Sequence, residues 1–307
     1  MTTNQLLVPI VLIVTSLMIP LIVMVVVRFA VKDEVMALAN VEVAAPEAKF
    51  DTIGDFWTGM APHLFELRDR LVKSVLALGI GTAIGFYLVN STNLLGMALP
   101  DFMVKHLAPP GTTLQAVQVG ETFFAYMRIA LVVGTAMAMP VIVYQIVAFF
   151  SPGLLPNEKR IVYTALPFVS ELFLAGLLFG WSFTVPAALA FLLNYGTSEM
   201  VANKPTIESF MGLVATLLLW NGLIFELPAI VFLLARLGIV TTKQLAATRR
   251  YAIVIITIIA ALITPTGDPY NLLLLAGPMY LLYELGILLS RFVPKKPEEP
   301  TIALPTS

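Results

Sequence analysis

The sequence contains no cysteine and only two histidines, and each shortage excludes some kinds of site. Without thiols, disulfides and thiolate-bound metal or redox groups are excluded. His63 and His106 fall on opposite sides of the membrane in the topology derived below, which excludes a bis-histidine haem within one subunit. The chain also lacks a phosphate-binding loop, a His-Glu-x-x-His motif and a Gly-x-Ser-x-Gly motif. We expect no cofactor, no metal, no enzymatic activity and no nucleic-acid partner, and the missing motifs are consistent with this expectation.

Charged residues are scarce, and the chain contains several long apolar runs. Charged residues make up 12 % of the 307 residues, against about 25 % in soluble domains, and hydrophobic residues make up 59 %. The mean hydropathy is +0.91. The apolar runs are 6–27, 71–90, 122–149, 161–194, 208–235, 251–263 and 272–290. Runs of this kind predict an all-α, polytopic membrane protein with six core helices and one extra N-terminal transmembrane helix.

The positive charges orient these helices. Of the 18 lysines and arginines, 15 lie in segments that share one side of the membrane: 28–73, 159–160, 236–250 and the stretch after 290. Lys105 and Lys204 fall on the other side. Because cytoplasmic loops are enriched in lysine and arginine, the crowded side is predicted to be cytoplasmic, with the C-terminus inside.

The first apolar run is typical of an uncleaved anchor, since no lysine or arginine precedes it and the positive charges follow it. The predicted organisation is an N-terminal membrane anchor at 1–27, a cytoplasmic linker at 28–59, a six-helix membrane domain at 60–292 and a cytoplasmic tail at 293–307. We expect an amphipathic helix that starts near Pro62 and lies in the interface before the chain turns into the membrane. Glu66 and Arg70 have the spacing of a helical ion pair.

The run lengths are unequal, which bears on the shape of the protein. At about 1.5 Å per residue, 161–194 and 208–235 exceed a hydrocarbon core of about 30 Å, whereas 251–263 covers about 20 Å. Long helices beside a short one indicate a concave wall rather than a closed cylinder. Five prolines within the runs should add kinks; these are Pro140, Pro167, Pro186, Pro228 and Pro278.

Four charged side chains fall well inside the apolar runs, away from their ends: Arg128, Glu171, Glu226 and Glu284. A charge at the bilayer centre costs about 2.5–3.5 kcal/mol, so each should face protein or water. Glu226 lies near mid-membrane and is the leading functional candidate, because it must be solvated, paired or protonated there. Glu171 and Arg128 could form a structural pair, although their depths match poorly.

A short polar connection at 149–160 joins two of the runs and combines the apolar Phe149 and Leu154 with Glu158. Apolar surface next to a carboxylate at a membrane face suits a site for a basic peptide. Glu158 equally suits a helix start, where acidic residues are common, and it would offset Lys159 and Arg160.

The chain from about His63 to Arg291 resembles the TatC family, the receptor subunits of the twin-arginine protein translocase. The matching motifs occur in order: the segment from His63 to Leu71, the connection from Phe149 to Arg160, Phe225-Glu226-Leu227-Pro228, Arg249-Arg250-Tyr251, Thr264-Pro265-Thr266, Asp268-Pro269, Pro278 and Tyr283-Glu284. The chain departs from the usual six-helix form by its anchor at 6–27. Leu272 also stands where relatives often have glutamine.

The resemblance implies a six-helix, concave TatC-like bundle that acts as the core subunit of a translocase. Such a subunit binds Arg-Arg signal peptides at its cytoplasmic face and, with TatA-type and TatB-type single-span partners, moves folded proteins across the membrane using the proton-motive force. Self-association and a location in the inner (plasma) membrane are also implied. The implied signal-peptide-binding residues are Glu66, Arg68, Arg70, Phe149, Leu154 and Glu158, and Glu226 is the implied partner-binding residue. Carboxylates suit this task because they bind guanidinium groups in a bidentate fashion.

Two other classes of protein remain open at this point. A proton- or ion-coupled secondary transporter could use the buried Glu226 and Glu171 as carriers, but the sequence shows no internal repeat of the kind such folds often carry. A purely structural membrane subunit would be insensitive to substitution of Glu66 and Glu158.

Overall fold

The computed structural model describes residues 53–92, 96–109, 112–153, 156–195, 204–264 and 268–292. The predicted anchor at 1–27 and tail at 293–307 lie outside the described residues, so the extra N-terminal helix stays a prediction. Helices dominate the described part of the chain, whose one β-type contact is an isolated parallel bridge between Gln115 and Thr206. The all-α prediction is confirmed.

The α-helices follow in this order: α3 (Ile53–Asn90), α4 (Leu99–Leu107), α5 (Glu121–Phe150), α6 (Pro156–Phe179), α7 (Val185–Asn194), α8 (Ile207–Phe225), α9 (Leu227–Arg236), α10 (Thr242–Ala247), α11 (Arg249–Ile263) and α12 (Pro269–Ser290). By length and composition, 5 segments of the described part of the chain could cross a membrane: Ala61–Asn90, Glu121–Gly153, Ala165–Asn194, Ile207–Arg236 and Pro269–Ser290. With the 15-residue α11, they match the six predicted core helices.

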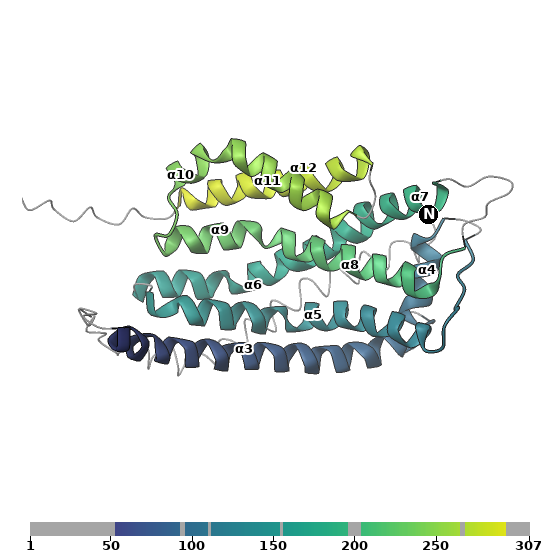
Figure 1. Ribbon diagram of the computed structural model, residues 1–307, viewed down its shortest axis with the longest axis horizontal. Helices are drawn as coiled ribbons and strands as arrows, with labels where there is room; N and C mark the ends of the chain where they lie inside the picture. Colours follow the sequence, from purple (N-terminus) through teal and green to yellow (C-terminus); the bar gives the residue numbers. More distant parts are fainter. Residues whose placement is uncertain are drawn as a thin grey trace, which may run out of the picture.

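The helices run alongside one another in a broad row (Figure 1). At one edge α3 packs mainly on α5, which in turn packs on α6 and α8. At the other edge α11 packs mainly on α12, which packs on α9. Because the two edges lie apart, the row forms an open wall rather than a closed cylinder, as the unequal run lengths predicted.

The connections gather at two ends of this row. The start of α3, the α5–α6 turn, α10 and the last turn of α12 lie at one end, on the left in Figure 1. This end carries Arg68, Arg70, Lys159, Lys243 and Arg250, and we call it the basic end. At the opposite end lie α4, the end of α7 and the start of α8, and we call it the outer end.

Two of the predicted kinks are breaks in the helical hydrogen-bonding pattern. A π-helical turn, Gly180–Thr184, joins α6 to α7 just before Pro186. Glu226 separates α8 from α9 just before Pro228. A proline ring removes an N–H donor and clashes with the carbonyl four residues earlier, which accounts for a break at each place. The other three prolines lie inside continuous helices; these are Pro140, Pro167 and Pro278.

The helix that enters the membrane begins earlier than predicted. It is already formed at Ile53 and continues through Pro62 to Asn90, so the predicted start near Pro62 is wrong. Figure 1 shows the first, darkest turns of α3 inclined to the rest, and a proline inside a helix produces such a bend. Residues 53–59, assigned to the linker from the sequence, belong to this helix, while the other domain boundaries stay predictions.

Glycines bring α3 and α5 into close contact. Gly81 and Gly85 lie one turn apart on α3 and face Ala130 and Gly134 on α5. A Cβ atom on Gly81 would lie 2.6 Å from the carbonyl oxygen of Gly134, and one on Gly85 would lie 2.6 Å from that of Ala130. Both separations are too short for a real side chain, so the backbones meet only because these residues are small, as in other membrane helix pairs.

Replacing Gly134 with valine should force α3 and α5 apart, because the new side chain would overlap the backbone of Thr82. We expect a loss of about 1–3 kcal/mol, the usual cost of overpacking, seen as a lower midpoint of thermal unfolding in detergent. Gly79→Val is the matched control, since among the described residues nothing lies within 4 Å of a Cβ at that position of α3. Equal losses in the two variants would contradict this account of the packing.

Candidate functional site

A carboxylate, a guanidinium and an amide meet at the basic end. Glu66 Oε1 accepts hydrogen bonds from Arg70 Nε at 2.9 Å and from Arg70 Nη2 at 2.6 Å. Arg70 Nη1 also donates to Oε1 of the buried Gln145 on α5, at 3.5 Å. The side chains of Glu66 and Arg70 are 31 % and 24 % exposed. Arg70 therefore holds Glu66 in one orientation at the contact between α3 and α5, and the predicted ion pair is confirmed.

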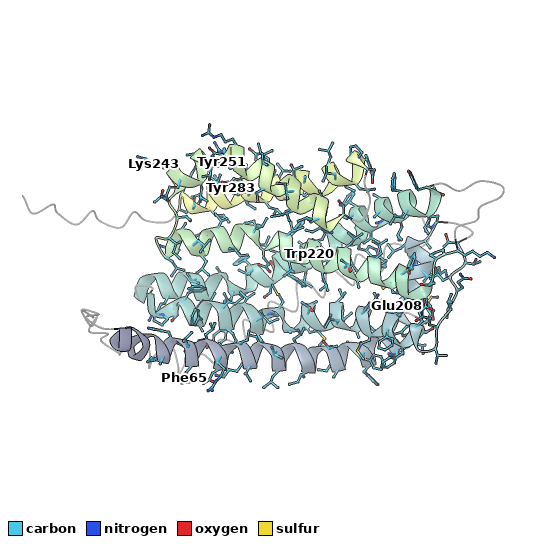
Figure 2. All side chains as sticks on the ribbon, in the orientation of Figure 1. Phe65, Glu208, Trp220, Lys243, Tyr251 and Tyr283 are labelled. Carbon is cyan, nitrogen blue, oxygen red and sulfur yellow. The ribbon has the colours of Figure 1, made fainter. Side chains whose placement is uncertain are left out.

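Arg68 points away from this cluster. Its guanidinium pairs with the adjacent Asp69 at 2.9 Å and lies 5.4 Å from the ring centroid of Phe65. Figure 2 shows Phe65 on the side of α3 that faces away from the other helices. Both members of the Arg68–Asp69 pair are mostly exposed, and an exposed pair contributes only about 0–1 kcal/mol. The structure thus brings Arg70, and not Arg68, to Glu66.

The other predicted peptide-binding residues flank the α5–α6 turn at the same end. Phe149 is half-buried in the last turn of α5, one helical turn beyond Gln145, with its ring centroid 5.2 Å from that of Phe150. Glu158 lies in the first turn of α6, where a carboxylate is favoured by the helix dipole. The side chain of Glu158 and all of Leu154 lie outside the described residues.

Glu226 lies at the break between α8 and α9 and is only 4 % exposed. Within the described part of the chain, neither of its carboxylate oxygens has a hydrogen-bond partner. Its neighbour Phe225 packs on Phe179 of α6, with ring centroids 5.6 Å apart. The sequence predicts that Glu226 must be solvated, paired or protonated near mid-membrane, and the structure encloses the side chain without a hydrogen-bond partner among the described residues. Burying an unpaired carboxylate is costly, so this position works against stability.

A second buried polar group lies on α8, five residues before Glu226, and it is satisfied. Asn221 Nδ2 donates to the carbonyl of Leu217 at 2.7 Å, and Asn221 Oδ1 accepts from Thr184 Oγ1 at 3.2 Å. Thr184 ends the π-helical turn between α6 and α7, a type of turn often found at functional sites. Neither residue was singled out from the sequence. The available signal was a lone amide in an apolar run that also carries Glu226.

Two other charged groups that the sequence analysis placed in the spans, Arg128 and Glu284, are paired. Arg128 Nη2 on α5 lies 2.7 Å from Glu208 Oε1 at the start of α8, labelled in Figure 2. Arg249 Nε lies 2.7 Å from Glu284 Oε1 at the basic end, and Glu284 also accepts from the hydroxyl of Tyr280. The suggested pairing of Arg128 with Glu171 is wrong, because Arg128 is engaged by a residue at its own depth. Glu226 is the carboxylate that is both buried and unpartnered in the described part of the chain.

Comparison with known proteins gives one consistent family. The family model for the Sec-independent protein translocase protein (TatC) matches residues 62–278. The chain is 33 % identical over 241 residues to the Sec-independent protein translocase protein TatC of Carboxydothermus hydrogenoformans, which covers 77 % of this chain and 93 % of the relative. It is 37 % identical over 247 residues to the TatC of Deinococcus radiodurans, covering 78 % of this chain and 89 % of the relative. A crystal structure of a twin-arginine translocase receptor, TatC, matches with a TM-score of 0.63 and 34 % identity, covering 75 % of this chain and 99 % of that chain.

Removing the unpartnered carboxylate should stabilise the isolated protein. For Glu226→Leu we expect a higher midpoint of thermal unfolding in detergent, because a buried unsatisfied polar group costs about 1–3 kcal/mol. Asn221→Leu is the matched comparison on the same helix, and it should lower the midpoint because it breaks two hydrogen bonds. A lower midpoint for Glu226→Leu would show that the carboxylate stabilises the fold.

Proposed function

The chain belongs to the TatC family of Sec-independent protein translocase proteins, and on that premise we propose that it receives twin-arginine signal peptides at its basic end. As a TatC protein it is a multi-pass membrane component of a protein translocase and not an enzyme. Family membership decides against an ion-coupled secondary transporter. The solved relative is described as a twin-arginine translocase receptor, and its match over the six-helix domain supports the same role for this chain.

The Glu66–Arg70 pair is the observation that carries the proposal. Both hydrogen bonds from Arg70 fall on Oε1 of Glu66, so Oε2 can accept from a further donor. A guanidinium of the peptide can bind there without displacing Arg70, in the charge-assisted geometry that carboxylates favour. A hydrogen bond to a charged group contributes about 1.5–3 kcal/mol.

A second arginine requires a second carboxylate, and Glu158 supplies it at the start of α6. Its backbone lies at the same end as Glu66, across the helix α5 that contacts both α3 and α6. Phe149 in the last turn of α5, and Leu154 in the adjoining connection, are proposed to contact the apolar residues near the arginine pair. Two carboxylates beside apolar surface match a peptide that carries two guanidinium groups.

Arg68 and Arg70 are assigned a supporting role in this proposal. Guanidinium groups repel one another, so neither side chain can bind the arginine pair directly. Arg70 instead orients Glu66 through its two hydrogen bonds and couples it to Gln145. Arg68 lies over Phe65 on the exposed side of α3, where it can meet the flanking part of the peptide or the lipid headgroups.

Substituting the two carboxylates should weaken binding of a fluorescent Arg-Arg signal peptide. Glu66→Ala and Glu158→Ala should each cost about tenfold in affinity, equivalent to roughly 1.4 kcal/mol, and the double variant more. Glutamine at either position should be nearly as harmful, because the interaction depends on charge. Asp69→Ala is the matched control, since Asp69 is an exposed carboxylate on the same helix and pairs with Arg68.

This assignment of the peptide site has a clear failing outcome. If the Glu66/Glu158 double variant keeps the thermal midpoint of the unsubstituted protein and binds the peptide equally well, the site lies elsewhere. A loss of binding in Asp69→Ala as large as in Glu66→Ala would point to net charge at the basic end rather than to these two carboxylates.

We further propose that Glu226 hydrogen-bonds a polar group of a TatA-type or TatB-type helix, and that these partners drive transport of folded proteins with the proton-motive force. The support is a buried carboxylate that has no partner in the described part of the chain. It lies between the 19-residue α8 and the 10-residue α9, where a break and Pro228 reduce the number of backbone hydrogen bonds that must be lost to open the site. Self-association of the subunit is also expected from the family and stays a prediction.

Cysteine crosslinking can test the role of Glu226, because the chain has no native cysteine. Leu223→Cys and Ile230→Cys flank Glu226 on α8 and α9 and are 46 % and 49 % exposed. We expect both to crosslink to a partner helix, Glu226→Gln to preserve the crosslinks, and Glu226→Ala to weaken them without loss of peptide binding. The proposal would be contradicted if Ile80→Cys on α3 formed equally strong crosslinks and the Glu226→Ala substitution did not weaken them.

The basic end is proposed to face the cytoplasm at the plasma membrane, with the C-terminus inside. The support is the concentration of lysine and arginine at that end. A membrane-impermeant maleimide should label Thr112→Cys from outside intact cells and Lys243→Cys only after the cells are opened. Labelling of both positions from the same side would overturn the topology.

A further inference from the structure

A buried carboxylate at the outer end holds an uncharged segment of chain. Residues 112–120 precede α5 and contain no charged side chain. Glu121, the first residue of α5, is 4 % exposed, and its Oε2 accepts from the backbone N–H groups of Val117 at 2.7 Å and Gln118 at 3.1 Å. Its Oε1 accepts from the backbone N–H of Glu208 at 3.3 Å. One carboxylate therefore ties this segment to the first turns of both α5 and α8.

An isolated parallel β-bridge between Gln115 and Thr206 holds the middle of the same segment. Gln115 N donates to the carbonyl of Pro205 at 3.2 Å, and Gln115 O accepts from Ile207 N at 3.0 Å. The side chain of Gln115 also donates to the carbonyl of Lys204 at 3.3 Å. In Figure 1 the segment runs across the outer ends of the helices, from α8 to the start of α5. Protein groups, rather than water, therefore satisfy many of its backbone polar groups.

The exposed side chains of this segment are uncharged, and two of them are valines. Val119 is fully exposed and Val117 is 68 % exposed. At the same end of the molecule, Phe123 in the first turn of α5 is 52 % exposed and Tyr87 in the last turn of α3 is 72 % exposed. Exposed valines, together with hydrogen bonds to several of the peptide groups, lower the free-energy cost of entering a bilayer interface, where unbonded backbone groups are costly.

The position of the segment along the membrane normal fits such a contact. The 30 residues of α5 extend about 45 Å, which exceeds a hydrocarbon core of about 30 Å. The outer end of α5 therefore reaches the headgroup layer, where aromatic side chains such as Tyr87 are common. The absence of charge in residues 112–120 removes the main obstacle to burial there.

We propose that residues 112–120 form an interfacial anchor that inserts Val117 and Val119 into the outer leaflet of the bilayer, and that Glu121 is the residue that positions it. The occupant of this surface is lipid. The anchor holds the outer ends of α5 and α8 together at the bilayer surface. It does not depend on the signal-peptide site at the opposite end of the molecule.

Spin labels on single cysteines test the anchor in the full chain reconstituted into lipid bilayers. A label at Val119→Cys should collide more with lipid-soluble oxygen than with a water-soluble nickel complex. Ile80→Cys, 62 % exposed in the middle of α3, sets the lipid reference, and Lys105→Cys on α4 sets the aqueous reference at the same end. A Val119 label that behaves like the Lys105 label overturns the proposal. Spin–spin broadening that disappears when the labelled protein is diluted with unlabelled protein would show that two labels lie close together. In that case a second copy of the chain, and not lipid, covers this surface.

The positioning role of Glu121 is tested in the Val119→Cys background. Glu121→Ala should shift the label toward the nickel complex, because the segment loses its acceptor for Val117 and Gln118. Asp101→Ala, an exposed acidic residue of α4 at the same end, should leave the label unchanged. An unchanged label in a folded Glu121→Ala protein overturns the role of Glu121. If Glu121→Ala does not fold, Glu121→Gln is used in its place. Glutamine keeps one acceptor oxygen, so the label should shift toward the nickel complex by a smaller amount, and an unchanged label would overturn the role of Glu121.

Discussion

Hydrocarbon cannot hydrogen-bond a polar group, and this constraint governs where each polar side chain of the spans lies. Arg128 meets Glu208, Arg249 meets Glu284, and Asn221 meets Thr184 across neighbouring helices. These contacts join α5 to α8, α11 to α12, and α8 to the π-helical turn. Glu226 breaks the pattern, since it is buried without a partner in the described part of the chain. This unpartnered carboxylate lies where a helix is interrupted.

The packing of α3 on α5 links this constraint to the peptide site. Gly81, Gly85 and Gly134 let the two backbones approach closely in the middle of the spans. Toward the basic end the same contact brings Arg70 within reach of Gln145, and Arg70 in turn fixes Glu66. A carboxylate on a helix that packs mainly on one neighbour is thereby held in a defined orientation. The glycine contact and the proposed peptide site are therefore parts of one interface.

Much of the fold could be predicted because its signals are local. Apolar runs predicted the six core helices, Pro186 and Pro228 marked the two helix breaks among five prolines expected to kink the helices, and the spacing of Glu66 and Arg70 predicted their pair. Partners far apart in the chain could not be predicted in this way: Arg128 and Glu208 are 80 positions apart, and their contact depends on the room left by Gly212. The burial of Glu226 depends on the packing of several helices. The helix start at Ile53 was missed because Pro62 suits a bend as well as a first turn.

The central claim is that carboxylates at the basic end recognise a pair of guanidinium groups. It is tested most directly by the affinity of the purified protein for a signal peptide with Arg-Arg and for the same peptide with Lys-Lys. Lysine carries the same charge but lacks the planar fork that binds a carboxylate through two hydrogen bonds. The account predicts binding of the Lys-Lys peptide that is weaker by about tenfold or more, roughly 1.4 kcal/mol. Equal affinity for the two peptides would contradict it.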